Sequence, residues 1–364
     1  MSSSSSAPLR APHTPLARVI AVALGLSLIV AVIVLAFAWP SVTAEPHDLP
    51  VAISGPDSAV ASVEDALAQK QPGVLDLRQV DDRDAAVAAI EKREVYGAIV
   101  LGSQQGEAPE VLTSSASNLS VSQLLSGVGS ALEAQINAQA TAAAAAAGAP
   151  APEHITVTVT DVVPLASSDP RGTGLTAAMF PLVMGGMIGG IVISIAVIGA
   201  LRRVLAVVVY AAVGGIVLTG ILAGWFGVLQ GDFWTQAAVI ALSLSAIAAP
   251  ITGAVALLGR AGIAVGPIVM LLFANPISGA TAPKEFLPGV WGAVGQWFPP
   301  GAAANLLRDA SYFPSADATF SWLVLGAWTV GGLLLSVIGH FRTAGGAESD
   351  ALAAHEDDPV LVAA

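Results

Sequence analysis

Residues 19–39 have the sequence VIAVALGLSLIVAVIVLAFAW, a run of 21 residues without a charged side chain. At about 1.5 Å per residue, a helix of this length crosses a hydrocarbon core of about 30 Å. Ala36 and Ala38 have the spacing of a signal-peptide cleavage site, but the run exceeds the roughly 7 to 15 apolar residues of a signal-peptide core. We therefore expect an uncleaved first membrane span over residues 19–39, with a cleaved signal peptide as the alternative.

Five further apolar blocks follow, and none contains Asp, Glu, Lys or Arg. Of the 364 residues, 55% are hydrophobic and 11% are charged, whereas soluble domains have about 25% charged residues. The sequence predicts an α-helical polytopic membrane protein with six transmembrane helices, of which residues 174–342 form a five-helix membrane domain. The predicted later spans are Leu175 to Leu201, Val204 to Leu229, Trp234 to Leu258, Ala261 to Ala274 and Phe320 to Gly339.

The positions of arginine predict the orientation of the spans, because short cytoplasmic loops retain positive charge. Six crossings place the arginines before the first span, between the second and third, between the fourth and fifth and after the sixth on the same side of the membrane. Both termini are then cytoplasmic, and residues 40–173 and 275–319 lie on the outer side. The arginines concerned are Arg10, Arg18, Arg202, Arg203, Arg260 and Arg342.

The net charge of −12 is concentrated in two parts of the chain. Residues 40–173 contain 17 acidic and 6 basic residues, and residues 343–364 contain five acidic residues and no basic one. This acidity argues against nucleic acid and against anionic lipid as partners. The membrane lipids that surround the spans remain as expected partners. We expect residues 1–18, which include a serine run, and the acidic tail to be disordered cytoplasmic segments.

Residues 40–173 are predicted to form a small α/β extracytoplasmic domain between the first and second spans, because short alternating apolar runs are separated by helical patterns. Asp81, Asp82 and Asp84 begin one of these helices, where acidic residues more often cap the helix than form a catalytic cluster. The expected strands cover 51–53, 74–80, 96–101 and 154–163, and the expected helices cover 58–70, 81–93 and 120–147.

Residues that could carry catalysis or bind a cofactor are scarce. There is no cysteine, and the five histidines are far apart in the sequence, which disfavours a metal cluster. None of the three lysines follows glycine, so the chain lacks the Gly-Lys-Ser/Thr of a phosphate-binding loop. The spans also lack an ionisable residue that could hold a coupling ion. We expect no cofactor and no enzymatic activity, and any ATP hydrolysis would belong to a separate chain.

The segment between the fifth and sixth predicted spans is rich in proline, glycine and aromatic residues. It contains NPISGATAP at residues 275–283, FLP at 286–288 and GQWFPPG at 295–301, and it continues to Arg308 and Phe313. Such a segment has too many helix breakers for a span and too few charges for an exposed loop. The pattern favours short broken helices that enter the outer leaflet and return, with their backbone buried in protein or lining a cavity.

This segment resembles the corresponding part of type-2 ABC transporter permeases and of the related phage infection protein-like membrane proteins of bacteria. The shared pattern is a Pro, a Leu-Pro, a Trp, a Pro-Pro-Gly step and a following Arg, and the order of one span, a large outward domain and five spans is similar too. The resemblance implies a bacterial cell-membrane protein whose re-entrant segment 275–319 closes the outer end of a translocation path. The candidate positions are Asn275, Pro276, Pro283, Pro288, Trp291, Gln296, Pro299, Pro300, Gly301 and Arg308, with Arg202, Arg203 and Arg260 for cytoplasmic coupling; the alternative is that the first set only shapes an outer cap.

Two functions remain open at this point. The first is the permease of an ABC-type exporter, a homodimer or heterodimer that moves a hydrophobic or lipid-like substrate outward with an ATP-binding subunit. The second is a non-transporting scaffold or receptor that acts through its outward domain. The inner loop at residues 201–203 offers little surface for an ATPase, which is a departure from the permease pattern. Glycine pairs four residues apart, at 185–190 and 220–224, indicate close helix packing within the chain or at a dimer contact.

Overall fold

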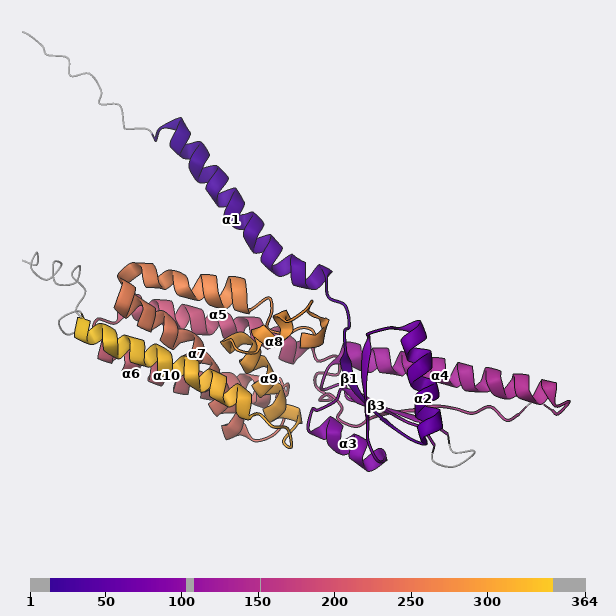
Figure 1. Ribbon diagram of the computed structural model, residues 1–364. Helices are drawn as coiled ribbons and strands as arrows, with labels where there is room; N and C mark the ends of the chain where they lie inside the picture. The colour runs from indigo at the N-terminus through magenta and orange to yellow at the C-terminus, as the bar shows by residue number, and fades with distance from the viewer. Residues whose placement is uncertain (1–13, 103–107, 151, 343–364) are drawn as a thin grey trace, which may run out of the picture.

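A computed structural model of the chain describes residues 14–102, 108–150 and 152–342. The chain forms a helical bundle and a sheet domain, which lie end to end (Figure 1). The predicted disordered segments fall almost entirely outside the described residues; of the first segment, only residues 14–18 are described, and residues 16–18 belong to the first helix.

Within the described ranges, five helices are long and apolar enough to cross a membrane. This finding supports a polytopic helical membrane protein. The predicted span over 261–274 is not among the five, because this part consists of a 3₁₀ segment, η2 (Gly259–Ala264), and a short π-helix, η3 (Gly266–Ala274). The count of six spans therefore stays a prediction. The five helices are α1 (Leu16–Val42), α5 (Thr173–Ala196), α6 (Ala200–Thr219) with the π-helical η1 (Gly220–Trp225), α7 (Phe233–Leu258) continued by η2, and α10 (Thr319–Arg342).

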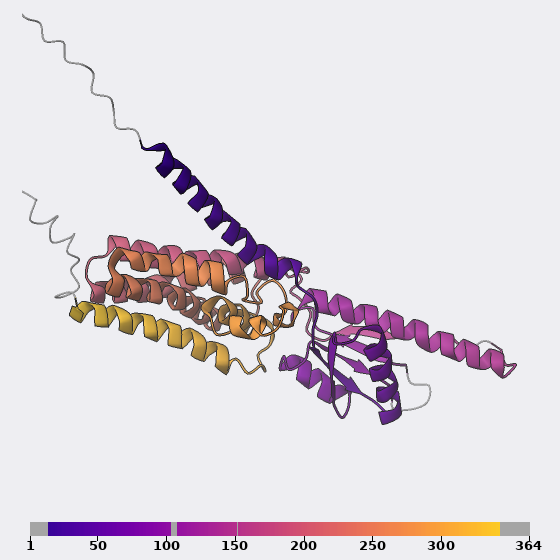
Figure 2. The ribbon, with the colours of Figure 1, turned by 45° about the horizontal axis from the view of Figure 1, so that its top comes forward.

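Helix α7 forms the centre of the bundle. Its side chains from Ser243 to Val255 are buried, and Ile240, Ile247 and Ile251 have no exposed surface. Helices α5, α6 and α10 pack around it, whereas α1 stands apart and exposes its apolar side chains along its length (Figures 1 and 2). A helix that is apolar on every face is stable in this central position because its neighbours cover it on all sides.

Glycine allows the helices to approach α7 closely. A Cβ atom at Gly186 would lie 2.8 Å from Ile247, and one at Gly190 would lie 2.9 Å from the carbonyl oxygen of Ala248. The glycines of α5 thus make contacts within the chain. Gly220 and Gly224 differ, since no side chain or backbone atom lies within 4 Å of a Cβ built at either position.

The sheet domain has five strands in the order β2-β1-β3-β4-β5. β1 pairs in parallel with β2 and β3, β3 pairs antiparallel with β4, and β4 pairs in parallel with β5. The side chains of β1 alternate: Val51 and Ile53 face α2 (Asp57–Lys70) and α4 (Leu119–Ala146), whereas Ala52 faces α3 (Arg83–Glu91). The strands are β1 (Leu49–Ser54), β2 (Leu75–Gln79), β3 (Gly97–Val100), β4 (Glu110–Thr113) and β5 (Thr158–Asp161).

Most elements of this domain lie where the sequence predicts them. The β-α-β order over 49–79, the helix after residue 82 and the long Ala-rich helix are confirmed, and Asp82 caps α3 by accepting a 2.8 Å hydrogen bond from the Ala85 amide. Strand β4 was not predicted, because four residues are too few to establish an alternation.

The start of α1, the turn between α5 and α6 and the end of α10 all lie at the end of the bundle that is distant from the sheet domain (Figures 1 and 2). The sheet domain and residues 275–318 lie at the opposite end. The arginine-bearing connections and the sheet domain are therefore separated by the length of the bundle.

Adjacent glycines in α10 provide a test of the packing around α7. A Cβ at Gly332 would lie 2.3 Å from the backbone of Ala249, whereas one at Gly331 would meet nothing within 4 Å. We expect Gly332→Ala to destabilise the protein by about 1 to 3 kcal/mol, as overpacking does. Gly331→Ala should be neutral or slightly stabilising, because alanine favours a helix by up to about 1 kcal/mol over glycine. Thermal unfolding in detergent measures both, and equal melting temperatures would contradict this packing.

Candidate functional site

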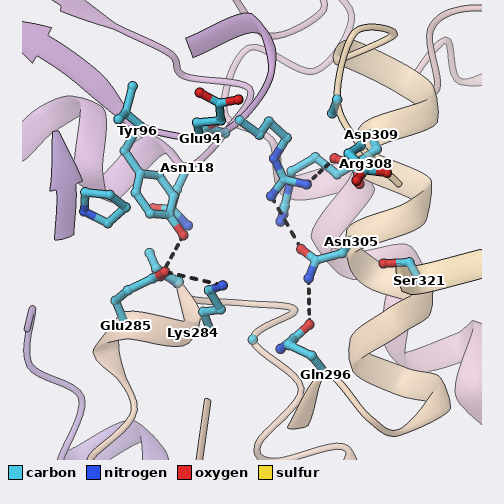
Figure 3. A pocket seen from close by; sticks show the side chains of 18 of the residues that line it. Glu94, Tyr96, Asn118, Lys284, Glu285, Gln296, Asn305, Arg308, Asp309 and Ser321 are labelled. Atoms are coloured by element: carbon cyan, nitrogen blue, oxygen red, sulfur yellow. Dashed lines mark hydrogen bonds and ion pairs between the residues drawn. The ribbon is translucent and has the colours of Figure 1, made fainter. Parts of the chain in front are cut away.

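A polar cavity of about 530 Å³ lies between the sheet domain and the end of the bundle. The sheet domain contributes the turn after α3 and the start of β3. The bundle side contributes η4 (Lys284–Phe286), α8 (Trp291–Gly295), α9 (Pro299–Tyr312) and the first turn of α10. Figure 3 shows Tyr96 and Glu285 on one side of the cavity and Asn305, Arg308 and Asp309 on the other.

The backbone at the end of α3 directs Arg93 toward the bundle. Arg93 follows the last turn of α3 in the left-handed region, with φ 57°, and its amide donates to the carbonyl oxygen of Ile90 at 2.9 Å. Its guanidinium forms an ion pair with Asp309 of α9 and lies 5.4 Å from the centre of the Phe313 ring. The two charged side chains expose 16% and 10% of their surface, so this ion pair between domain and bundle is largely shielded from water.

A second contact joins β3 to η4. The hydroxyl of Tyr96 donates to Glu285 Oε2 at 2.8 Å, and burial together with the Glu285 charge raises the pKa of Tyr96 well above its usual range. Phe286 packs against the core of the sheet domain. The amides of Glu45 and His47 donate to the carbonyl oxygens of Phe286 and Glu285 at 3.1 and 3.2 Å. Residues 284–286 are therefore attached to the sheet domain by backbone, side-chain and apolar contacts.

The rest of the segment is folded tightly on itself. A Cβ at Gly292 would lie 2.0 Å from the carbonyl oxygen of Lys284, and one at Gly295 would lie 1.8 Å from that of Ile277. We refer to residues 275–313 as the closure segment, because they cover the end of the bundle beneath the sheet domain. The glycines are required here by the close approach of backbone to backbone.

Gln296 connects the parts of the closure segment through hydrogen bonds. Its Nε2 donates to the carbonyl oxygens of Ser278 and Gly292, both at 3.1 Å, and its Oε1 accepts from Asn305 Nδ2 at 2.6 Å. The Oδ1 atom of Asn305 accepts from Arg93 Nη2 at 3.4 Å. A chain of polar contacts thus extends from the sheet domain through Asn305 to Gln296 (Figure 3), and from Gln296 to the buried turn at Ser278.

Arg308 lies on α9 next to the ion pair, and the surface that it retains faces the cavity. It makes no hydrogen bond or ion pair with any residue in the described part of the chain. Burial, and next the nearby Arg93 charge, lower the pKa of Arg308 to about 10, so it is still a cation at neutral pH. Two guanidinium groups therefore share the single carboxylate of Asp309.

The residues predicted for the translocation path divide into two groups. Pro283, Gln296 and Arg308 line the cavity. The others shape the segment: Pro299 and Pro300 begin α9, where proline needs no amide hydrogen, and Trp291 makes edge contacts with Trp39 and Phe273. Asn275 ends η3, Pro276 and Pro288 lie in turns, and Gly301 packs against the carbonyl oxygen of Gly295.

The residues predicted for cytoplasmic coupling have different surroundings. Arg202 and Arg260 are exposed. Arg203 is buried, and its Nε and Nη2 donate to the carbonyl oxygens of Val197 and Ser194, both at 2.8 Å. Arg203 thus satisfies carbonyl groups at the end of α5, as cationic side chains near helix C-termini often do.

Sequence reasoning did not identify Arg93, Tyr96, Glu285, Asn305 or Asp309 as site residues. The sequence predicts Arg93 at the end of a helix, where a positive charge interacts favourably with the helix dipole. Asp309 offered a weak signal, since it is an acidic residue in an apolar segment directly after Arg308. The pairing of residues 93 and 309 could not be inferred from one sequence, because 216 residues separate them.

No group of three or more His, Asp or Glu residues that could hold a metal ion is found among the residues described by the structure. Searches with family models, among curated proteins and among solved structures found no match to this chain.

The Arg93–Asp309 ion pair can be tested by removing one charge. We expect Asp309→Asn to destabilise the protein by about 3 kcal/mol, because it leaves the Arg93 guanidinium unpaired in a shielded position. The matched control is Asp76→Asn, which breaks an exposed pair with Arg78 and should cost about 0 to 1 kcal/mol. Thermal unfolding and limited proteolysis of the sheet domain report the effect. If both variants melted alike, the pair would not hold the domain to the bundle.

Proposed function

We propose that this chain is the membrane subunit of an ABC-type exporter in a bacterial cell membrane. It moves a hydrophobic or lipid-like substrate outward, and a separate ATP-binding subunit hydrolyses ATP. The sheet domain lies outside the membrane, the ends of α1 and α10 that are distant from it face the cytoplasm, and the chain works as a dimer.

The attachment of the sheet domain to the closure segment carries this proposal. Arg93 binds Asp309, Tyr96 binds Glu285, and Phe286 enters the apolar core of the sheet domain. A displacement of the domain would therefore displace the residues that cover the end of the bundle. This is the behaviour required of an outer gate, and the π-helical η3, which leads directly into the closure segment, is a common feature of functional sites in helices.

A second function, a non-transporting receptor or scaffold in the cell envelope, is favoured by a different observation. Only residues 197–199 separate α5 from α6, and the buried Arg203 side chain is occupied with carbonyl groups of that turn. Such a turn offers little surface on which an ATPase could act. In this case the sheet domain would bind its partner without an energised cycle.

The orientation can be tested with single cysteines, since the natural chain has none. Ser62 of α2 and Arg202 at the opposite end are both exposed. We expect a membrane-impermeant maleimide to label Ser62→Cys in intact cells, and to label Arg202→Cys only after the membrane is permeabilised. The reverse pattern would place the sheet domain in the cytoplasm and exclude an outer gate.

Energy coupling can be tested with the protein purified from its native membrane in mild detergent. We expect vanadate-sensitive ATP hydrolysis to co-purify with the chain. Charge reversal at the exposed positions, Arg202→Glu with Arg260→Glu, should lower it about tenfold without changing the melting temperature, because a docking surface loses its attraction for the partner.

Lys70→Glu serves as the control, because it changes an exposed basic residue of the sheet domain that lies outside the cavity and is distant from the proposed docking surface. It should leave ATP hydrolysis unchanged. A stable, monodisperse preparation that contains no nucleotide-binding chain and hydrolyses no ATP would contradict the exporter and favour the receptor.

A further inference from the structure

The aromatic residues locate the level of the membrane interface. Six of the seven tryptophans are at least partly exposed at the end of the bundle that carries the sheet domain, where helices begin or end or where the closure segment lies. Tryptophan concentrates at the depth of lipid headgroups, where its ring is apolar and its N–H is hydrated. The six are Trp39, Trp225, Trp234, Trp291, Trp297 and Trp322.

The polar cavity lies at this same level. Trp297 and Phe320 line it while exposing 62% and 41% of their surface, and their rings meet edge to face with centres 4.9 Å apart. Phe320 belongs to the first turn of α10, one of the five helices apolar enough to cross a membrane. The cavity is thus bordered by aromatic surface at the depth where the headgroups of the outer leaflet would lie.

Inside the cavity, Arg308 has no ion-pair partner of its own among the described residues, because it shares the charge of Asp309 with Arg93. Asp309 is already paired with Arg93, and Glu285 accepts from Tyr96 and lies 3.8 Å from Lys284 Nζ. An enclosed cation without a partner is unfavourable, and an anion that enters the cavity would remove that cost. The open rim carries both charges: the exposed acids Glu94 and Asp317, of which Asp317 also accepts from the Thr319 amide, and the exposed bases Arg78 and Lys92.

We propose that this cavity binds the headgroup of a zwitterionic phospholipid, with the phosphate at Arg308, the amine toward Glu94 and Asp317, and the acyl chains against Trp297 and Phe320. The acidic sheet domain repels anionic membrane surfaces, whereas a zwitterion carries no net charge and suits an inner cation with a rim of mixed charge that includes Glu94 and Asp317. That this lipid is the exported substrate depends on the proposed function; that it binds does not.

Native mass spectrometry of the delipidated full-length chain in a maltoside detergent tests the binding. After each lipid is added separately, we expect phosphatidylethanolamine to bind, and phosphatidylglycerol and diacylglycerol to bind at least tenfold more weakly. Arg308→Gln should lower the bound fraction of phosphatidylethanolamine about tenfold, and Trp297→Ala several-fold, whereas Lys70→Gln, an exposed residue of α2 outside the cavity, should have little effect. The melting temperature of unliganded Arg308→Gln should be unchanged or raised, because an unpaired enclosed charge is removed.

Several results would overturn the assignment. Displacement of the lipid by millimolar inorganic phosphate would make the cavity a free-anion site, and equal binding of phosphatidylglycerol would remove the role of the amine. If Arg308→Gln bound phosphatidylethanolamine as well as the wild type, Arg308 would not be the phosphate ligand. If that variant failed to fold, unchanged binding of the lipid to Trp297→Ala would show that the acyl chains do not lie against Trp297. The assay contains no ATPase, so lipid binding without ATP hydrolysis would refute only the exporter and leave a lipid receptor.

Discussion

The ion pair between Arg93 and Asp309 determines how the two halves of this protein are joined. Both charges are shielded, so separating them would leave a guanidinium or a carboxylate without a partner inside the protein. Arg93 reaches α9 from a left-handed backbone conformation at the end of α3. The cavity has walls from both halves, and the pair holds them together along with the Tyr96–Glu285 hydrogen bond and the packing of Phe286.

The charged side chains that line the cavity are not all paired, and this distinguishes the cavity from an ordinary interface between two domains. A purely structural contact would pair every enclosed charge, as Arg93 is paired with Asp309 and as Arg203 is bound to carbonyl groups of α5. Arg308 departs from this rule within the same turn of α9, and burial lowers its pKa. Proteins tolerate such a cost mainly where function uses it. The local charge at Arg308 is positive even though the chain as a whole carries −12, so the net charge does not predict what the cavity binds.

The sequence predicts the parts of the fold that depend on composition over many residues. About 20 residues without a charge can hardly be anything other than an apolar helix, and the short apolar run at residues 51–53 predicts a strand. Short or irregular elements are not predicted from the sequence, such as the four residues of β4 and the π-helical η3. The closure segment was located correctly as an irregular region, but its prolines mainly begin or end helices, whereas its site is completed by Arg93 and Tyr96 from the sheet domain. That contact depends on tertiary structure, which a single sequence does not reveal.

The contacts of the closure segment are unequal at its two ends, and this bears on how the protein works. Toward the sheet domain it is held by an ion pair, a tyrosine hydrogen bond and backbone hydrogen bonds. Toward the membrane it continues into η3, whose π-helical hydrogen bonds are less favourable than those of an α-helix, and it meets the otherwise isolated α1 through Trp39 and Trp291. A displacement of the sheet domain would therefore move the attached closure segment with it. At the far end, Arg203 fixes the α5–α6 turn. The contacts of the closure segment thus tie it to the sheet domain more closely than to the α5–α6 end of the bundle.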